Sequence, residues 1–454
     1  MAAERAKTAA LKGKRLDNMK HTILTLILFA GVSLALHAEE PSLRLVGGDI
    51  SLLPSYEQYN TPYKDRDGKK IDDLVTYAAN TLGWNACRVR LFVNPCIINP
   101  DNKNRQGEVQ DLAYVAALGK RIKQAGMFLL LDFHYSDTWA DPVKQVIPTA
   151  WQSLNEQQLY DTMYTYTRMC IQTLVDAGAT PDYVQIGNEI SYGILLRGKS
   201  TTSEDRVYPT DTYDKAPTQW GRFCGLLNQG AKAVREVCPY SKIIIHIERT
   251  SNANACVQFY KNLNQGEVDY DIIGLSYYPF WHGRLTTELP NTLNAIHKAH
   301  PDKKIQIVET AYYNNYWPSS GISYDTRDLY PATPAGQDAF LADLITTLKG
   351  YDYIDGLYYW FPEENGNGGA SYDANKIVID TWLNRGLFDP STHKAYAGLY
   401  RLGEFSGIVS GMDALRTDNG STMYYTLLGV PMGIDRNTLP AGIYIHNGKK
   451  EVIQ

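Results

Sequence analysis

Short apolar runs alternate with longer helical patterns between residues 43 and 402. The short runs are rich in Ile, Val, Leu and Tyr, as expected of buried parallel strands, whereas the longer stretches repeat apolar residues at every third or fourth position. Eight short runs are candidate strands: 43–50, 86–93, 127–133, 182–188, 242–247, 271–276, 304–309 and 356–360. Candidate helices between them include 112–124, 157–175, 219–237, 289–299 and 334–349.

Eight strands with intervening helices favour a closed (β/α)₈ TIM barrel of the α/β class, which we expect over residues 39–402. An open dinucleotide-binding sheet is disfavoured, because Gly-Gly-Asp-Ile-Ser follows the first strand in place of the Gly-rich fingerprint. The longer loops follow strands three, four, seven and eight and are rich in Trp, Tyr, Asn, Asp and Pro. Such loops share one face of a barrel, so we expect the active site there.

The two ends of the chain depart from this alternation. From Met19 the chain reads charged, then apolar, then small residues up to Ala38, which is typical of a secretory signal. We expect residues 1–38 to direct export to the periplasm or the cell exterior, with Met19 as the natural start and the earlier residues as upstream sequence or a cloning addition. The apolar run is too short for a membrane span, and none is expected in the mature chain. Residues 403–454 are expected to be a short β-rich tail, either a sorting tail or a packing hairpin.

Composition narrows the possible partners. The chain is 44% hydrophobic and 20% charged, with a net charge of −5 and no basic stripe, so nucleic-acid binding is not expected. The 33 Tyr and 8 Trp outnumber the 11 Phe, and rings with a polar edge suit sugar surfaces. The six cysteines have no metal-ligand spacing, which leaves free thiols or one disulfide. We expect a monomer that acts on a neutral polymer.

Two candidate strands end in a carboxylate. Glu189 closes strand four and Glu309 closes strand seven, three strands apart around an eight-stranded ring. Both therefore lie at the catalytic mouth and face a shared substrate. Glycoside hydrolysis needs such a pair, one as a proton donor and one to attack or stabilise the anomeric carbon. Asn188 precedes Glu189, and its amide can hydrogen-bond the sugar 2-hydroxyl.

The stretch LLLDFHYSDTWADP at 129–142 resembles the strand-three signature of glycoside hydrolase family 53, the endo-β-1,4-galactanases. Further similarities follow in the family's order over roughly 43–402. They are GGDIS at 47–51, RVRLFVNP at 88–95, QIGNEI at 185–190, IIH at 244–246, GLSYYPFW at 274–281, VET at 308–310 and LYYW at 357–360.

This resemblance implies a retaining endo-hydrolase of β-1,4-galactan and type I arabinogalactan, with Glu189 as acid/base and Glu309 as nucleophile. It implies no cofactor for the chemistry. Two rivals stay open: an enzyme of the same clan acting on mannan, xylan or glucan, and a non-catalytic glycan-binding barrel.

Supporting roles are assigned to residues of the same motifs. Arg88 and Arg90 share one parity on strand two, so at least one is expected to hold the nucleophile, unless both form structural ion pairs inside the barrel. Either Tyr277 or Tyr278 is expected to hydrogen-bond Glu309. The remaining expected substrate-binding residues are Asp49, His134, Asp137, Trp139, Asp141, His246, Trp281 and Trp360, with Trp360 beneath the reacting sugar.

The chain departs from the family in its eighth loop. Phe361 stands where the family often has Glu, so Glu363 or Glu364 is a candidate replacement. Family members from bacteria can bind calcium near this loop; the usual Asp-rich segment is missing here, and residues 364–380 are the alternative cation site. His134 and His246 have no HExxH spacing, so metal catalysis is not expected.

Overall fold

The computed structural model describes residues 43–58, 62–95, 109–315, 317–366 and 384–407, and parts of 424–453. The chain divides into two compact units, Met1–Leu43 and Arg44–Gln454, and the description concerns the second. The expected export signal at 1–38 lies outside the described residues, as does most of the expected cation-binding stretch.

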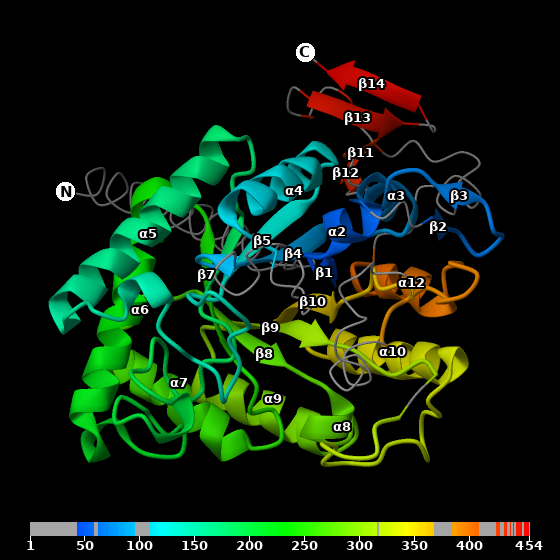
Figure 1. Ribbon diagram of the computed structural model, residues 1–454. Coiled ribbons are helices and arrows are strands. Elements are labelled where there is room, and N and C mark those ends of the chain that lie inside the picture. Colours follow the sequence, from blue (N-terminus) through cyan, green and yellow to red (C-terminus); the bar gives the residue numbers. More distant parts are fainter. Residues whose placement is uncertain are drawn as a thin grey trace, which may run out of the picture. The chain divides into compact units, whose positions relative to one another are not determined.

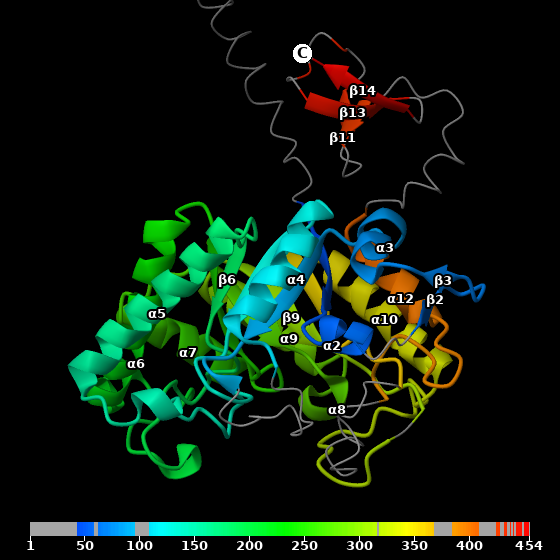
Figure 2. The same ribbon diagram turned by 45° about the horizontal axis from the view of Figure 1, so that its top comes forward.

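Eight parallel strands form a closed barrel with the neighbour order β1-β10-β9-β8-β7-β6-β5-β4. Figures 1 and 2 show these strands surrounded by the longer helices, with α4 lying over β4 and β5. The strands are β1 Leu45–Asp49, β4 Ala86–Leu91, β5 Phe128–Phe133, β6 Tyr183–Ile186, β7 Lys242–Ile247, β8 Ile272–Ser276, β9 Lys304–Thr310 and β10 Ile354–Trp360. The predicted fold class is therefore confirmed.

The strand runs are apolar because both faces of a barrel strand are covered. β4 and β8 are buried along their whole length, and β7 is exposed only at its first residue. β1 meets β4 very closely: a Cβ on Gly47 would lie 1.8 Å from the carbonyl oxygen of Ala86. Glycine at this position permits the register that places Asp49 beside Arg88 at the catalytic end.

Helices occupy the predicted stretches with small changes at their ends. α5 begins at a capping box in which Asn155 and Gln158 satisfy each other's backbone N–H groups, and α10 begins after the N-cap Thr333. The longer helices are α3 Leu74–Thr81, α4 Leu112–Gln124, α5 Glu156–Asp176, α6 Pro217–Val237, α7 Ala253–Gln265, α9 Glu288–Ala299 and α10 Pro334–Lys349. The shorter ones are α2 Leu53–Gln58, α8 Pro279–His282 and α12 Ala397–Arg401.

Strands outside the barrel form two small sheets. β2 Tyr63–Lys64 pairs with β3 Lys70–Ile71. Near the C-terminus four antiparallel strands have the order β12-β11-β13-β14, and their buried residues form a separate apolar cluster. Their bounds are β11 Tyr424–Thr426, β12 Pro431–Gly433, β13 Gly442–His446 and β14 Lys449–Ile453.

Two further findings bear on the expectations. The five described cysteines, Cys87, Cys170, Cys224, Cys238 and Cys256, are buried free thiols, so no disulfide joins them. Within the described part of the chain, no helix is long and apolar enough to cross a bilayer.

Candidate active site

Glu189 lies on a tight turn that follows β6, three residues beyond the strand's last residue. Gly187 has φ 87° and Glu189 has φ 49°, so the chain leaves the barrel through two left-handed residues. This is why strand four ends at Ile186 and not at 188 as predicted. The left-handed region costs a non-glycine residue roughly 1 kcal/mol or more. A hydrogen bond from the backbone N–H of Ile190 to the carbonyl of His246 (3.0 Å) helps to hold the turn.

Glu309 lies within β9 and is almost fully buried. Nη1 of Arg88 lies 2.9 Å from its Oε1, and the hydroxyl of Tyr278 donates to its Oε2 at 2.8 Å. Both carboxylate oxygens therefore have a donor, and Tyr278 is the tyrosine that fulfils the expected contact. Burial raises the pKa of Glu309 above its ordinary value, although Arg88 and Tyr278 oppose the rise.

Arg88 is the centre of the charge arrangement. Besides Glu309, its guanidinium contacts Asp49 (2.6 Å), Asp132 (2.8 Å) and the side-chain oxygen of Asn188 (2.8 Å). Burial alone would lower the pKa of Arg88, but Asp132, Glu309 and Asp49 raise it above its ordinary value. The permanently charged, buried guanidinium of Arg88 thus holds together groups from four strands or strand ends.

Glu189 has the opposite environment. Its Oε1 accepts a hydrogen bond from Ser276 at 2.7 Å, and no arginine or lysine ion pair with Glu189 is found in the described residues. Burial raises the pKa of Glu189 well above its ordinary value, and the charges of Glu309 and Glu248 raise it further. The two carboxylates consequently differ: the neighbours of Glu309 favour its ionised form, whereas burial and nearby negative charges favour the protonated form of Glu189.

Aromatic rings line the same end of the barrel. The Arg90 guanidinium lies 4.5 Å from the Trp139 ring centroid and its Nη1 lies 3.0 Å from Asp49, while the Trp139 and Trp360 rings are 6.2 Å apart. The Arg385 guanidinium lies 4.6 Å from the Trp360 ring centroid. Trp281 is only partly buried, and its indole N–H donates to Gly321 at 2.8 Å.

A match to known proteins agrees with this geometry. The family model described as glycosyl hydrolase family 53 matches residues 45–399. The chain belongs to glycosyl hydrolase family 53. It is 33% identical over 360 residues to an arabinogalactan endo-beta-1,4-galactanase of Cellvibrio japonicus, which covers 76% of this chain and 87% of that protein. It is 29% identical over 347 residues to an endo-beta-1,4-galactanase of Bacillus subtilis, 74% of each chain.

A solved structure supports the assignment. The catalytic domain of the family 53 protein from Ignisphaera aggregans shares 30% identity with this chain and superimposes with a TM-score of 0.67, covering 80% of this chain and 97% of that one. The chain described by the structure is therefore a glycoside hydrolase, as predicted.

The loop after β5 is built by the residues that were expected to touch sugar. Nδ1 of His134 accepts the backbone N–H of Ala140 (2.9 Å), and its Nε2 lies 3.1 Å from Asp132. Asp137 is buried and accepts the backbone N–H groups of Asn94 (3.0 Å) and Thr149 (2.8 Å). These two side chains shape the loop from inside, and their expected contacts with sugar stay a prediction.

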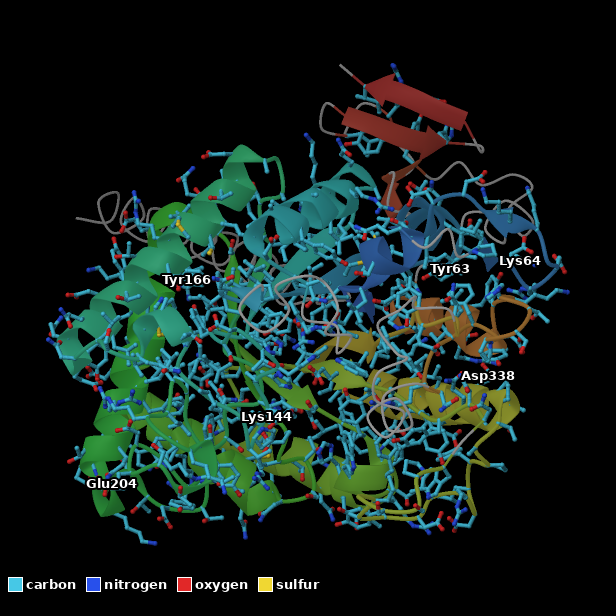
Figure 3. The ribbon with its side chains drawn as sticks, viewed as in Figure 1. Tyr63, Lys64, Lys144, Tyr166, Glu204 and Asp338 are labelled. Carbon is cyan, nitrogen blue, oxygen red and sulfur yellow. The ribbon has the colours of Figure 1, made fainter. Side chains whose placement is uncertain are left out.

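Asp141, by contrast, lies at the rim of this loop and is partly exposed. It accepts the backbone N–H of Val143 at 2.8 Å and lies 3.8 Å from Lys144, which Figure 3 labels. Its charge is close enough to raise the pKa of Glu189. Asp141 therefore stays available to a ligand near the acid/base.

Three other sets of residues expected near the substrate are bonded to groups inside the protein. Tyr277 points away from the site, because its hydroxyl donates to the carbonyl of Gly283 (2.8 Å) and its ring packs near Phe340. His246 is completely buried and contacts Gln185, Asn188 and Ser276, and its expected contact with sugar stays a prediction. Glu363 and Glu364 are also buried, and they accept the backbone N–H groups of Leu52 (2.9 Å) and Gly366 (2.6 Å).

Glu363 and Glu364 thus fix the eighth loop and do not replace a sugar ligand. Burial raises the pKa of Glu363 to about 8 and that of Glu364 to about 7. Across the residues that the structure describes, no group of three or more His, Cys, Asp or Glu side chains is arranged to hold a metal ion.

Several functional residues were not assigned from the sequence. Asp132 and Gln185 lie inside the motifs that resemble the family, and Ser276 lies in the strand-six motif, so the signal was present without a role attached. Asp132 accepts from both Arg88 and Gln185, and Gln185 contacts His246 at 3.2 Å. Arg385 lies outside every motif, and nothing in the sequence pointed to it.

Proposed function

We propose that this family 53 enzyme is a retaining endo-β-1,4-galactanase with Glu189 as acid/base and Glu309 as nucleophile. The observation that carries the proposal is the unequal environment of the two carboxylates. Glu309 receives an arginine and a tyrosine hydroxyl, whereas Glu189 receives one serine hydroxyl and lies near other negative charges. A retaining hydrolase needs one ionised and one protonated carboxyl group at the start of the reaction.

In the first step, an oxygen of Glu309 attacks C1 of the sugar and the glycosidic bond breaks. The proton of Glu189 moves to the departing oxygen, so the leaving group is an alcohol and not an alkoxide. Arg88 holds Glu309 in place and opposes the rise in pKa that burial causes, which favours the ionised form of the attacking group.

In the second step, Glu189 takes a proton from water, and the water oxygen displaces Glu309 from C1. Once Glu309 is esterified its charge is lost, so the pKa of Glu189 falls and the carboxylate is ready to act as a base. Each proton that leaves Glu189 in the first step is returned in the second.

Binding roles follow from the side chains that surround the pair. We propose that Trp360 lies under the reacting sugar, that Trp139 and Trp281 stack on neighbouring sugars, and that Asn188 binds the 2-hydroxyl. The Asn188 amide donates to the carbonyl of Ala140 at 2.8 Å, and its second N–H can serve the sugar. Arg90 packs against the Trp139 ring, and Asp49 forms ion pairs with both Arg88 and Arg90.

The substrate is assigned from relatives whose names specify arabinogalactan or β-1,4-galactan. Incubation with potato galactan should release a series of galacto-oligosaccharides whose stereochemistry at C1 is retained, as read by NMR of the first products. Faster release of reducing ends from mannan, xylan or glucan would instead favour another activity of the same clan.

Glu309→Gln separates an enzyme from a glycan-binding barrel. It keeps the shape and the hydrogen bond to Tyr278 but removes the attacking charge, so we expect turnover to fall by at least about 10⁴-fold while galactan is still retarded in affinity electrophoresis. A parent protein that binds galactan but never cleaves it would support the binding barrel.

Export, cofactor independence and a monomeric state also stay proposals. Export through residues 1–38 predicts a mature N-terminus at residue 39 when the protein is secreted by a bacterial host. If a cation is bound in the eighth loop, chelation should lower the thermal midpoint without abolishing the reaction. Light scattering in solution should give the mass of one chain.

A further inference from the structure

Ser276 and His246 form a continuous hydrogen-bonded chain that ends at the carboxyl group of Glu189; we call these two residues the relay. The hydroxyl of Ser276 lies 2.7 Å from Oε1 of Glu189 and 2.8 Å from Nε2 of His246. Both Ser276 and His246 are completely buried. The serine hydroxyl is therefore held from both sides, and its direction determines what Glu189 receives.

The partners of the other ring nitrogen indicate that direction. Nδ1 of His246 lies 3.2 Å from the side-chain nitrogen of Gln185 and 3.4 Å from the backbone nitrogen of Glu189, and both are donors. A neutral ring that accepts at Nδ1 carries its hydrogen on Nε2 and donates it to Ser276. The side-chain oxygen of Asn188 also lies 3.0 Å from Nδ1, but it already accepts a hydrogen bond from Arg88 at 2.8 Å.

The charges around the chain keep the histidine neutral. Burial holds the pKa of His246 well below its ordinary value, and Arg88 lowers it further against the opposing charge of Asp132. The titratable and charged groups that face the relay are Glu309, Glu248 and Asp141 around the carboxyl group, and Arg88, Asp132, His134 and His282 around the imidazole.

We propose that Ser276 and His246 are positioning residues that determine which oxygen of Glu189 carries the transferable proton. Ser276, oriented by His246, donates to Oε1, and the proton of the acid is thereby confined to Oε2. The proton on Oε2 moves to the leaving oxygen and is later replaced from water, while the relay itself neither gains nor loses a proton. This inference rests on the proposed acid/base role of Glu189.

The relay predicts the direction in which the alkaline limb of the pH profile moves when Ser276 is replaced. A donor at Oε1 stabilises the ionised carboxyl group, so its removal raises the pKa of Glu189. In Ser276→Ala the alkaline limb of kcat/KM on galactan should move up by about one pH unit, which corresponds to the loss of one hydrogen bond to a charged group. Ser276→Thr keeps the hydroxyl and should restore the limb.

Histidine variants test whether His246 acts through the serine. His246→Asn lacks a donor at the position of Nε2 and should move the limb in the same direction, whereas His246→Gln can still donate and should move it less. In the Ser276→Ala background, His246→Asn should add no further shift. Ser241→Ala removes another buried serine hydroxyl, one that donates to the carbonyl of Pro181 (2.7 Å), and should leave the limb unchanged.

Two further readouts decide the mechanism. A 2,4-dinitrophenyl β-galactobioside needs no acid in the first step, so Ser276→Ala should slow cleavage of galactan more than release of dinitrophenolate. In ¹⁵N NMR of histidine-labelled full-length protein, with His246→Asn to identify the resonance, the proton should be found on Nε2. An active Ser276→Ala enzyme whose alkaline limb stays in place or moves down, or a proton found on Nδ1, would overturn the relay.

If the proposed galactanase activity or the acid/base role of Glu189 is wrong, the experiments give different results. This would show as wild-type protein that releases no sugar from galactan, or as a Glu189→Gln variant with full activity, whatever the serine variants do.

Discussion

Tyr278→Phe should change the acid limb of the pH profile without disturbing the barrel. The substitution deletes a single hydroxyl, which donates to Oε2 of Glu309 at 2.8 Å from a completely enclosed position. A hydrogen bond to a charged group contributes about 1.5–3 kcal/mol, which corresponds to about one to two pH units. Glu309 must be ionised to attack, so activity is lost as the pH falls through its pKa. Removal of the donor raises that pKa, and the acid limb moves to higher pH.

The assay is kcat/KM on galactan from pH 3 to pH 10, with the thermal midpoint measured in parallel. At the optimum we expect kcat to fall by about 10- to 150-fold, because the same hydrogen bond stabilises Glu309 as it departs from C1 in the second step. Tyr277→Phe is the matched control: it removes an equally buried hydroxyl from the adjacent residue, whose partner is the carbonyl of Gly283. It should lower stability by about 1 kcal/mol and leave both limbs in place.

A lower rate in Tyr278→Phe with an unmoved acid limb would contradict this explanation. Tyr278 would then contribute through packing against Trp281, whose ring centroid lies 5.1 Å away, and not through the charge of Glu309.

Two other substitutions test the turn and the barrel interior. Gly187→Ala places a Cβ 2.7 Å from Ile190 at φ 87°, so we expect kcat to fall by at least tenfold with only a few degrees lost in the thermal midpoint; an unchanged kcat would show that the turn does not position Glu189. Burial raises the pKa of Asp355 to about 6, so the folded state binds the proton more tightly than the unfolded state and stability falls as the pH rises from about 4 to 6. Asp355→Asn should lack this fall in melting curves recorded across that range, and a parallel decline in both proteins would assign it to other groups.

The barrel and the meeting of Glu189 and Glu309 at one end of it could be predicted because each depends on local pattern. Eight apolar runs of strand length specify eight strands, and a carboxylate at the end of two of them specifies a site. The sequence could not distinguish Tyr277 from Tyr278, because both are large, polar-tipped and adjacent. The structure separates them: Tyr278 donates to Glu309, while Tyr277 packs outward near Phe340.

Long-range contacts account for most of what the sequence missed. Arg385 packs against Trp360 from a segment with no strand or helix signal, so no periodic pattern could place it. His134 and Asp137 lie in the expected loop, but only the fold shows that their polar atoms are used by backbone groups. Strand periodicity predicts which side of a strand a residue occupies, whereas loop residues take their direction from contacts that no local rule encodes.

The end of β8 provides one hydrogen-bond donor to each of the two carboxylates. Ser276 and Tyr278 are two residues apart, so both face the interior, and Tyr277 between them faces the helices. Ser276 donates to Glu189, which lies on the turn after β6, and Tyr278 donates to Glu309, which lies in β9. A small shift of this strand end would therefore disturb Glu189 and Glu309 together. Because Ser276 is paired in register with Glu309 itself, the barrel's own hydrogen bonds oppose such a shift.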